Sequence, residues 1–144
     1  MLYTYNINTQ ELAVNNNVAF AVNGVVTGRC NCTPVISHDA GAATVSLNAP
    51  GIYFVTFNAD SATTGDAGIV TAQLYTGAEE ALGAEASAYS SAVTSPVNLA
   101  FTTLIRVAPN CRAVCDNVPV ALTVRNIGVA ATYTNAAITV TKVG

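Results

Sequence analysis

The stretch "NAPGIYFVTFNAD", residues 48–60, decides the fold because both of its faces are apolar. Side chains alternate between the two faces of a strand, so Tyr53 and Phe57 point one way, and Ile52 and Phe54 point the other. A sheet with one wet face carries polar residues on that face. An uncovered apolar patch of this kind exceeds what monomers normally expose. We therefore expect the second face to be covered, either by the same chain or by other copies of it.

The composition also favours a surface that is largely buried. Of the 144 residues, 51% are hydrophobic and 9% are charged, whereas an average soluble domain has roughly 25% charged residues. The centres of protein interfaces are depleted of Lys, Glu and Asp. The low fraction of charged residues therefore favours a protein whose surface is packed against partners. The length of the chain fits a single domain.

The charge pattern argues against several classes of partner. The net charge of −3 comes from eight acids and five bases scattered along the chain, without a basic patch, so the sequence predicts no nucleic-acid binding. No apolar run reaches the roughly 18 residues of a membrane helix, so we expect no membrane association. The N-terminal "MLYTYNINTQ" lacks the basic start and apolar core of a secretory signal. We expect the chain to be made and folded in a cytoplasm.

The secondary structure is predicted to be all β. Short runs of Val, Ile, Thr, Tyr and Phe alternate with Gly, Pro, Asn and Asp, which is typical of a sandwich or barrel of about eight to ten strands. Segment 77–92 is rich in Ala and Glu, but Gly83 and the following Ser residues favour a loop and an edge strand. The better-marked strands are expected at 17–23, 34–39, 43–49, 52–62, 68–77, 96–108, 118–127 and 135–143.

Four segments in this order, "APGIYFVTFNADSA", "GIVTAQLYTG", "VNLAFTTLIRV" and "NAAITVTKVG", resemble the ten-strand jelly rolls of the tumour necrosis factor and complement-q superfamily. The likeness is nearest to the bacterial and phage branch, which includes the C-terminal domain of the spore exosporium glycoprotein. It implies an all-β jelly-roll sandwich over residues 17–144, preceded by an N-terminal arm or edge strand at 1–16. The residues that carry it are Pro50, Gly51, Tyr53, Val55, Phe57, Gln73, Tyr75, Gly77, Lys142 and Val143.

The resemblance also implies a quaternary structure. Proteins of this superfamily form compact homotrimers in which one sheet of each subunit packs around the three-fold axis. Neighbouring copies would then cover the second apolar face of strands 52–62 and 96–108. The alternative is a single sandwich whose long loops fold over that sheet. The residues expected at the axis, if the inner and outer faces are not exchanged, are Ile52, Phe54, Ala100 and Leu104.

The function expected from the resemblance is structural. Small stand-alone versions with a "YTYN"-like start resemble phage proteins that decorate capsids or form head fibres, and the sequence has no Gly-X-Y stalk. We expect a non-enzymatic trimer on the virion surface, with itself and the major capsid protein as partners. The alternative is a receptor- or glycan-binding head module, such as a fibre tip or an extracellular or spore-surface display protein. Its contacts would come from Tyr75, Tyr89 and Tyr133.

The four cysteines form two close pairs, Cys30 with Cys32 and Cys111 with Cys115, both in expected loops. A disulfide between the pairs would close a loop of about eighty residues and stabilise the fold by roughly 4 kcal/mol. Four cysteines allow several connectivities. Their C-x-C and C-x-x-x-C spacings differ from the usual zinc knuckle. Disulfides, free thiols and a metal site all remain open.

His38 lies in "ISHDA" between Ser37 and Asp39, an order that invites comparison with a hydrolase triad. Catalytic triads assemble in space, however, and neighbours on a strand point to opposite faces. We therefore expect no catalytic residues. The sequence also lacks a D-x-D-x-D calcium loop and a Gly-rich phosphate loop, so we predict neither a metal nor a cofactor.

Overall fold

The computed structural model describes residues 1–27, 34–109 and 118–144, and in these ranges the chain forms eleven strands and no helix. The all-β jelly-roll sandwich is confirmed, with one strand more than the ten expected. The strands are β1 (Leu2–Asn6), β2 (Gln10–Leu12), β3 (Val22–Val26), β4 (Ile36–His38), β5 (Val45–Leu47), β6 (Gly51–Thr63), β7 (Gly68–Thr76), β8 (Glu79–Ser90), β9 (Val97–Val107), β10 (Val120–Asn126) and β11 (Ala131–Lys142).

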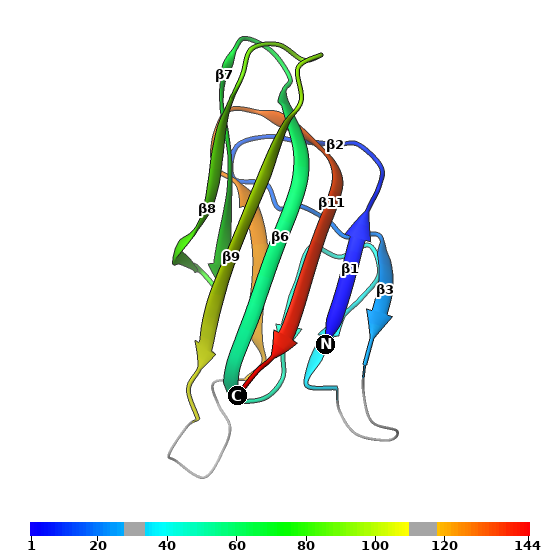
Figure 1. Ribbon diagram of the computed structural model, residues 1–144, viewed down its shortest axis with the longest axis vertical. Coiled ribbons are helices and arrows are strands. Elements are labelled where there is room, and N and C mark those ends of the chain that lie inside the picture. The colour runs from blue at the N-terminus through cyan, green and yellow to red at the C-terminus, as the bar shows by residue number, and fades with distance from the viewer. Residues whose placement is uncertain (28–33, 110–117) are drawn as a thin grey trace.

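Two antiparallel sheets make the sandwich (Figure 1). Sheet A has the order β3-β1-β11-β6-β9, and the short β2 also pairs with β11. Sheet B has the order β4-β5-β10-β7-β8. Most neighbours within a sheet are distant in sequence, so each sheet is assembled from the whole length of the chain. Both strands with two apolar faces, β6 and β9, lie next to each other in sheet A.

The first strand lies inside sheet A. Leu2 pairs with Val140 of β11 on one side and with Val26 of β3 on the other, and its side chain is fully buried. The sequence predicted an N-terminal arm or edge strand over residues 1–16, whereas the structure places β1 between two partners. Both partners come from distant parts of the chain, so no local pattern indicates that this strand is paired on both sides.

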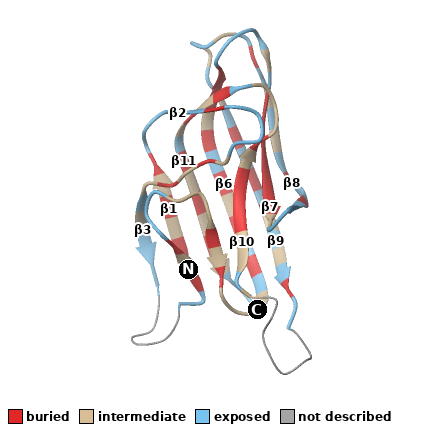
Figure 2. Ribbon diagram, turned by 180° about the vertical axis from the view of Figure 1, so that it is seen from behind, coloured by how far each residue is buried: buried red, intermediate tan, exposed pale blue. Residues whose placement is uncertain are grey.

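The core fills the space between the two sheets. The inward side chains of β6, Tyr53, Val55 and Phe57, are almost completely buried, and Phe57 stacks on Phe101 of β9 with ring centroids 5.2 Å apart. Figure 2 shows the resulting alternation of buried and less buried residues along the strands. The opposite side chains of β6 and β9 therefore point out of the molecule.

Strand β8 is an edge strand of sheet B, as the sequence predicted, but it also occupies most of the segment that was expected to be a loop. It spans twelve residues and pairs with β7 on both sides of a register shift. Gln73 pairs with Glu85, and Tyr75 pairs with Glu80. One residue of β7 therefore lies opposite residues 81–84 of β8, and these four residues form a bulge. Gly83 has a φ of +80°, in the left-handed region that glycine adopts readily. Small alanines on the inward face, instead of β-branched residues, hide this strand in the sequence.

Candidate functional site

The outer face of sheet A consists of the side chains of β1, β11, β6 and β9 that point away from the core. Cross-strand pairing aligns these side chains in rows because the strands are in register. The three central rows are Thr141–Phe54–Leu104, Tyr3–Thr139–Thr56–Thr102 and Tyr5–Ala137–Asn58–Ala100.

Charged side chains on this face lie only at its two ends. Arg106 stands opposite Ile52 at one end, and Asp60 stands opposite Asn98 at the other. The Asp60 carboxylate accepts hydrogen bonds from the side-chain amides of Asn98 and Asn135, each at 3.3 Å. Within the described strands, the three central rows contain no ionisable group besides two tyrosines. Covering the centre would therefore bury no formal charge, which keeps its desolvation cost low.

All four residues that the sequence predicted for the trimer axis lie on this outer face. Ile52 is 41% exposed, Phe54 is 39% exposed and Leu104 is 62% exposed, and Ala100 is exposed as well. No segment within residues 1–27, 34–109 or 118–144 covers them. The structure thus brings these four side chains onto one surface, and their role in an interface stays a prediction.

A shallow hollow of about 260 Å³ lies on the same face beside Tyr3 and Tyr5. The two rings stack with centroids 5.5 Å apart and lie over Gly24 of β3. A Cβ atom at Gly24 would come within 2.8 Å of Cδ1 of Tyr3, so only glycine lets the rings lie this close to β3. Ala137 and Thr139 also line the hollow. Sequence reasoning missed this feature because its walls come from both ends and from the middle of the chain.

The outer face of sheet B has a different chemistry. The Arg125 guanidinium lies 4.0 Å from the centroid of the Tyr75 ring, and the Tyr75 hydroxyl donates a hydrogen bond to Glu80 Oε1 at 3.1 Å. Burial beneath these neighbours raises the pKa of Tyr75, and the hydrogen bond and charge of Glu80 raise this pKa further. The aromatic ring is thus covered by side chains of its own sheet.

Two more hydrogen-bonding groups complete that face. The Gln73 amide nitrogen donates to the carbonyl oxygens of Ala81 and Leu74, at 2.9 and 3.0 Å. Thr71 Oγ1 lies 2.9 Å from Ser87 Oγ. Gln73 is 4% exposed although it points outward. Gln73 is therefore paired with backbone carbonyl oxygens of its own chain, and Thr71 with Ser87.

The tyrosines that the sequence suggested as ligand contacts lie in different surroundings. Tyr133 is fully buried in β11, where its hydroxyl donates to Thr71 O and to Asn126 Oδ1, each at 3.2 Å. Burial raises the pKa of Tyr133 well above its ordinary value. Tyr75 is covered as described, and only Tyr89, 64% exposed, lies on the surface. The expectation that these three tyrosines lie in loops is therefore wrong, because all three lie in strands and two of them are buried.

Ser37, His38 and Asp39 are not brought together as a catalytic group. His38 is buried, with Nδ1 2.6 Å from Asn23 Oδ1 and Nε2 2.9 Å from the Ala42 carbonyl oxygen. Ser37 Oγ instead accepts a hydrogen bond from the Asn48 side chain at 2.9 Å. The imidazole of His38 thus links β4 to β3 and to the loop that follows β4, so its hydrogen bonds stabilise the fold.

The remaining predicted site residues, Cys30, Cys32, Cys111 and Cys115, lie outside the described residues. Among the residues that the structure does describe, no three His, Cys, Asp or Glu side chains are grouped so as to hold a metal ion. Nor does this part of the chain contain a helix long and apolar enough to cross a membrane.

This chain is similar to known proteins in its fold and not in its sequence. No protein-family model and no curated protein matches the sequence. Among solved structures, murine APRIL has a TM-score of 0.66 and 10% identity, over 99% of this chain and 97% of that one. Eiger TNF from S. frugiperda has a TM-score of 0.67 and 13% identity, over 99% and 91% of the two chains. The PRD1 vertex protein P5 has a TM-score of 0.56 and 16% identity, over 99% and 96%.

These matches confirm the resemblance that the sequence indicated. The chain has a jelly roll like that of tumour necrosis factor proteins, and the same fold occurs in a phage vertex protein. Each match extends over almost the entire length of both chains.

Proposed function

We propose that the protein is a non-enzymatic structural component of a phage particle, a homotrimer that decorates the capsid or forms part of a head fibre. The observation that carries this proposal is the outer face of sheet A, whose central rows have no formal charge and on which Phe54 and Leu104 stay exposed. The likeness of the fold to a phage vertex protein supports the virion setting. The major capsid protein would be the partner, and the virion surface the location.

The energetics support assembly through this face. Burying a fully exposed Phe or Leu side chain stabilises a protein by about 1.5–3 kcal/mol. Phe54 and Leu104 are 39% and 62% exposed, so each contributes on the order of 1 kcal/mol per subunit when covered. In a trimer this gain recurs in every copy. The threonines around them lose little on burial if they form hydrogen bonds across the interface.

The first test is the absolute mass of the purified chain in solution, measured by light scattering after size exclusion. We expect three times the chain mass of 14.7 kDa. The second test is cosedimentation of this trimer with phage capsids that lack it, in the absence of host cells. A stable monomer of 14.7 kDa would contradict the assembly. A trimer that fails to bind capsids would contradict the decoration role alone.

One observation favours a receptor- or glycan-binding head module as the second candidate. Ile69 and Tyr89 are cross-strand partners on the outer face of sheet B, and they are 56% and 64% exposed. Exposed aromatic and aliphatic pairs are common at recognition sites. Binding of the trimer to cell walls or glycans, lost in a Tyr89→Ala variant, would favour this function and an extracellular location. Capsid binding unaffected by that substitution would favour decoration.

A further inference from the structure

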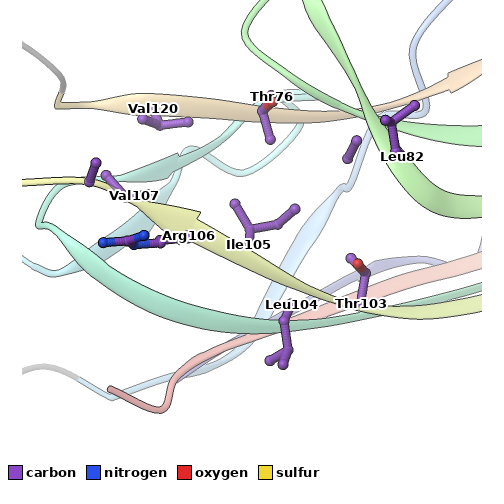
Figure 3. Close-up of a pocket in the computed structure, with 10 residues that line it drawn as sticks. Thr76, Leu82, Thr103, Leu104, Ile105, Arg106, Val107 and Val120 are labelled. Atoms are coloured by element: carbon purple, nitrogen blue, oxygen red, sulfur yellow. The ribbon is translucent and has the colours of Figure 1, made fainter.

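The two side edges of the sandwich differ in their chemistry. At one of them, between β8 and β9, a hollow of about 480 Å³ is lined mostly by aliphatic side chains. In Figure 3, Ile105 points toward Thr76 and Val120, while Leu104 points the opposite way. The other edge, formed by β3 and β4, carries an amide, an imidazole and a hydroxyl within hydrogen-bonding reach of one another. The more reactive side chains of the two edges therefore lie beside β3.

Residues 23 and 24 of β3 form the only Asn-Gly dipeptide in the sequence. In such a dipeptide the backbone nitrogen of glycine can attack the side-chain amide carbon of asparagine, because no side chain shields that nitrogen. A bond forms from this nitrogen to Cγ, the bond from Cγ to Nδ2 breaks, and ammonia leaves a cyclic imide. Water then opens the imide and yields aspartate or isoaspartate. The reaction consumes water, releases ammonia and needs no oxidant.

The packing of β3 explains why a glycine follows this asparagine. The pairing of β3 with β1 shifts between Tyr3 and Thr4, so that it skips Gly24. A Cβ atom on Gly24 would lie 2.8 Å from Cδ1 of Tyr3. The close approach of the Tyr3 ring thus requires the residue that makes Asn23 reactive. Gly24 is exposed and Asn23 is half-buried, so water reaches the dipeptide.

His38 of β4 binds both polar atoms of the Asn23 amide. Nδ2 of Asn23 donates a hydrogen bond to the His38 carbonyl oxygen at 2.9 Å, and Oδ1 lies 2.6 Å from His38 Nδ1. We call these two interactions the Asn23–His38 contact. The imidazole is itself fixed, because Nε2 lies 2.9 Å from the Ala42 carbonyl oxygen and Nδ1 lies 3.4 Å from Thr4 Oγ1.

The Asn23–His38 contact opposes the closure of the imide ring. Closure requires the Asn23 side chain to rotate until its Cγ atom reaches the nitrogen of Gly24. Such a rotation breaks both interactions with His38. Asn23 is also paired with Thr4 of β1, and this pairing keeps its backbone extended. Ring closure is therefore confined to molecules in which β3 has opened locally, and these are a minority of the population.

We propose that Asn23 is a deamidation site that the Asn23–His38 contact keeps unreacted in the folded chain. Conversion would remove this contact. An aspartate carboxylate has no N–H group for the His38 carbonyl oxygen, so two acceptors would face each other. Isoaspartate lengthens the backbone and would break the register of β3 with β1. The reaction thus releases β3 from β4. This inference goes beyond the proposed function and does not depend on it.

The first test follows the conversion of Asn23 by peptide mapping with mass spectrometry during storage in mildly alkaline buffer. The wild type is compared with His38→Ala, which removes the imidazole but keeps the backbone carbonyl oxygen. Gln73→Leu is the matched control, because it removes buried hydrogen bonds at the other edge of sheet B. We expect conversion to be about fivefold faster or more in His38→Ala. Gln73→Leu should convert at a rate close to that of the wild type.

A second test uses Asn23→Asp, which places a product of the reaction in the chain from the start. We expect its midpoint of urea unfolding to fall, because the hydrogen bond to the His38 carbonyl oxygen is lost. The control is Asn8→Asp, since Asn8 is exposed and the substitution adds the same charge. Its midpoint should stay near that of the wild type. An Asn23→Asp chain as stable as Asn8→Asp would overturn the release of β3 from β4.

The rate experiment has further outcomes that contradict the inference. Conversion of the folded wild type as fast as that of the chain unfolded in urea would overturn the protection. Equal rates in His38→Ala and the wild type would overturn the role of His38, and so would equal acceleration in His38→Ala and Gln73→Leu. An unfolded chain that does not convert at Asn23 would overturn the site itself. A monomeric wild type would contradict the proposed function and leave this inference in place.

Discussion

The outward side chains of the two sheets differ in polarity and in how far they are exposed. On sheet B, the outward side chains of Gln73 and Tyr75 are polar or amphipathic and yet are less than 10% exposed, and they donate hydrogen bonds to the Ala81 carbonyl oxygen and to the Glu80 carboxylate. On sheet A, outward side chains such as Phe54 and Leu104 are apolar and yet remain exposed. The polar residues of the sheet B face are covered within the chain, whereas Phe54 and Leu104 on sheet A stay exposed in the single chain, as do Ile69 and Tyr89 on sheet B.

This difference shows that the exposure of an outward side chain indicates its role only when its polarity is considered as well. A polar residue that is buried on an outer face indicates a local network. Apolar residues that stay exposed side by side, as Phe54 and Leu104 do, favour an interaction surface. Four substitutions test this distinction, from the largest expected effect to the smallest.

Phe54→Asp should abolish trimers. A carboxylate at the centre of the outer face of sheet A would be buried without a partner in every copy, at a cost of several kcal/mol each. The same change at Ile69 on sheet B leaves the carboxylate in water. We expect light scattering to give a mass of 14.7 kDa for Phe54→Asp and a trimer for Ile69→Asp. A trimeric Phe54→Asp protein of normal stability would exclude this face from the interface.

Gln73→Leu should destabilise the fold of each chain. It removes the hydrogen bonds to the carbonyl oxygens of Ala81 and Leu74, and leaving buried groups without partners costs about 1–3 kcal/mol. The measurement is urea unfolding, made in the Phe54→Asp background so that only folding contributes. An unchanged unfolding free energy would mean that the network on sheet B adds nothing to stability.

Tyr133→Phe should cost about 1 kcal/mol at neutral pH, through loss of its hydrogen bonds to Thr71 and Asn126. Burial raises the pKa of Tyr133 in the folded chain above the ordinary value of 10.0. The stability linked to its neutral phenol is therefore fully present below pH 10 and is lost as the pH rises above that value. Above pH 10, the unfolding free energy of Tyr133→Phe should consequently fall less steeply than that of the wild type. Parallel curves for the two proteins would contradict this.

Arg125→Ala should have the smallest effect, because it removes the contact between the guanidinium and the Tyr75 ring, which is worth about 0.5–1 kcal/mol at a partly exposed site. Arg125→Lys is the control, since it keeps a cation but not the planar group. We expect urea unfolding to place Arg125→Lys between the wild type and Arg125→Ala. A larger loss for Lys than for Ala would contradict a favourable cation–π contact, because lysine keeps the positive charge and alanine does not.

The strands with strong local patterns were predictable from the sequence. β6, β7, β9 and β10 are runs of Val, Ile, Phe and Thr bounded by Gly or Pro, and their bounds differ from the expected ones by at most two residues. The two apolar faces of β6 and β9 also predicted that these strands would need a second cover, but alternation alone did not say which face is the outer one. Local alternation carries this information because it depends on the strand alone.

The features that could not be predicted depend on contacts between segments that are distant in the sequence. Tyr133 was expected on a loop, but the pairing of β11 with β6 turns its ring into the core. The bulge of β8 is fixed by Gln73, a residue on another strand, so its own Ala and Glu content did not indicate it. The hollow beside Tyr3 and Tyr5 requires β1 to pair with β11, which no local pattern shows.

The position of β1 also has a consequence for the order of events during synthesis. The outer face of sheet A needs Leu2–Asn6 to pair with Ala136–Val140, almost the full length of the chain apart. Contacts of such large sequence separation form late and slowly. A ribosome-bound chain that has not yet exposed β11 cannot present this surface, so nascent chains on one message cannot join prematurely through a finished face. Where copies join through this face, the topology of the fold therefore delays that contact until β11 has been synthesised.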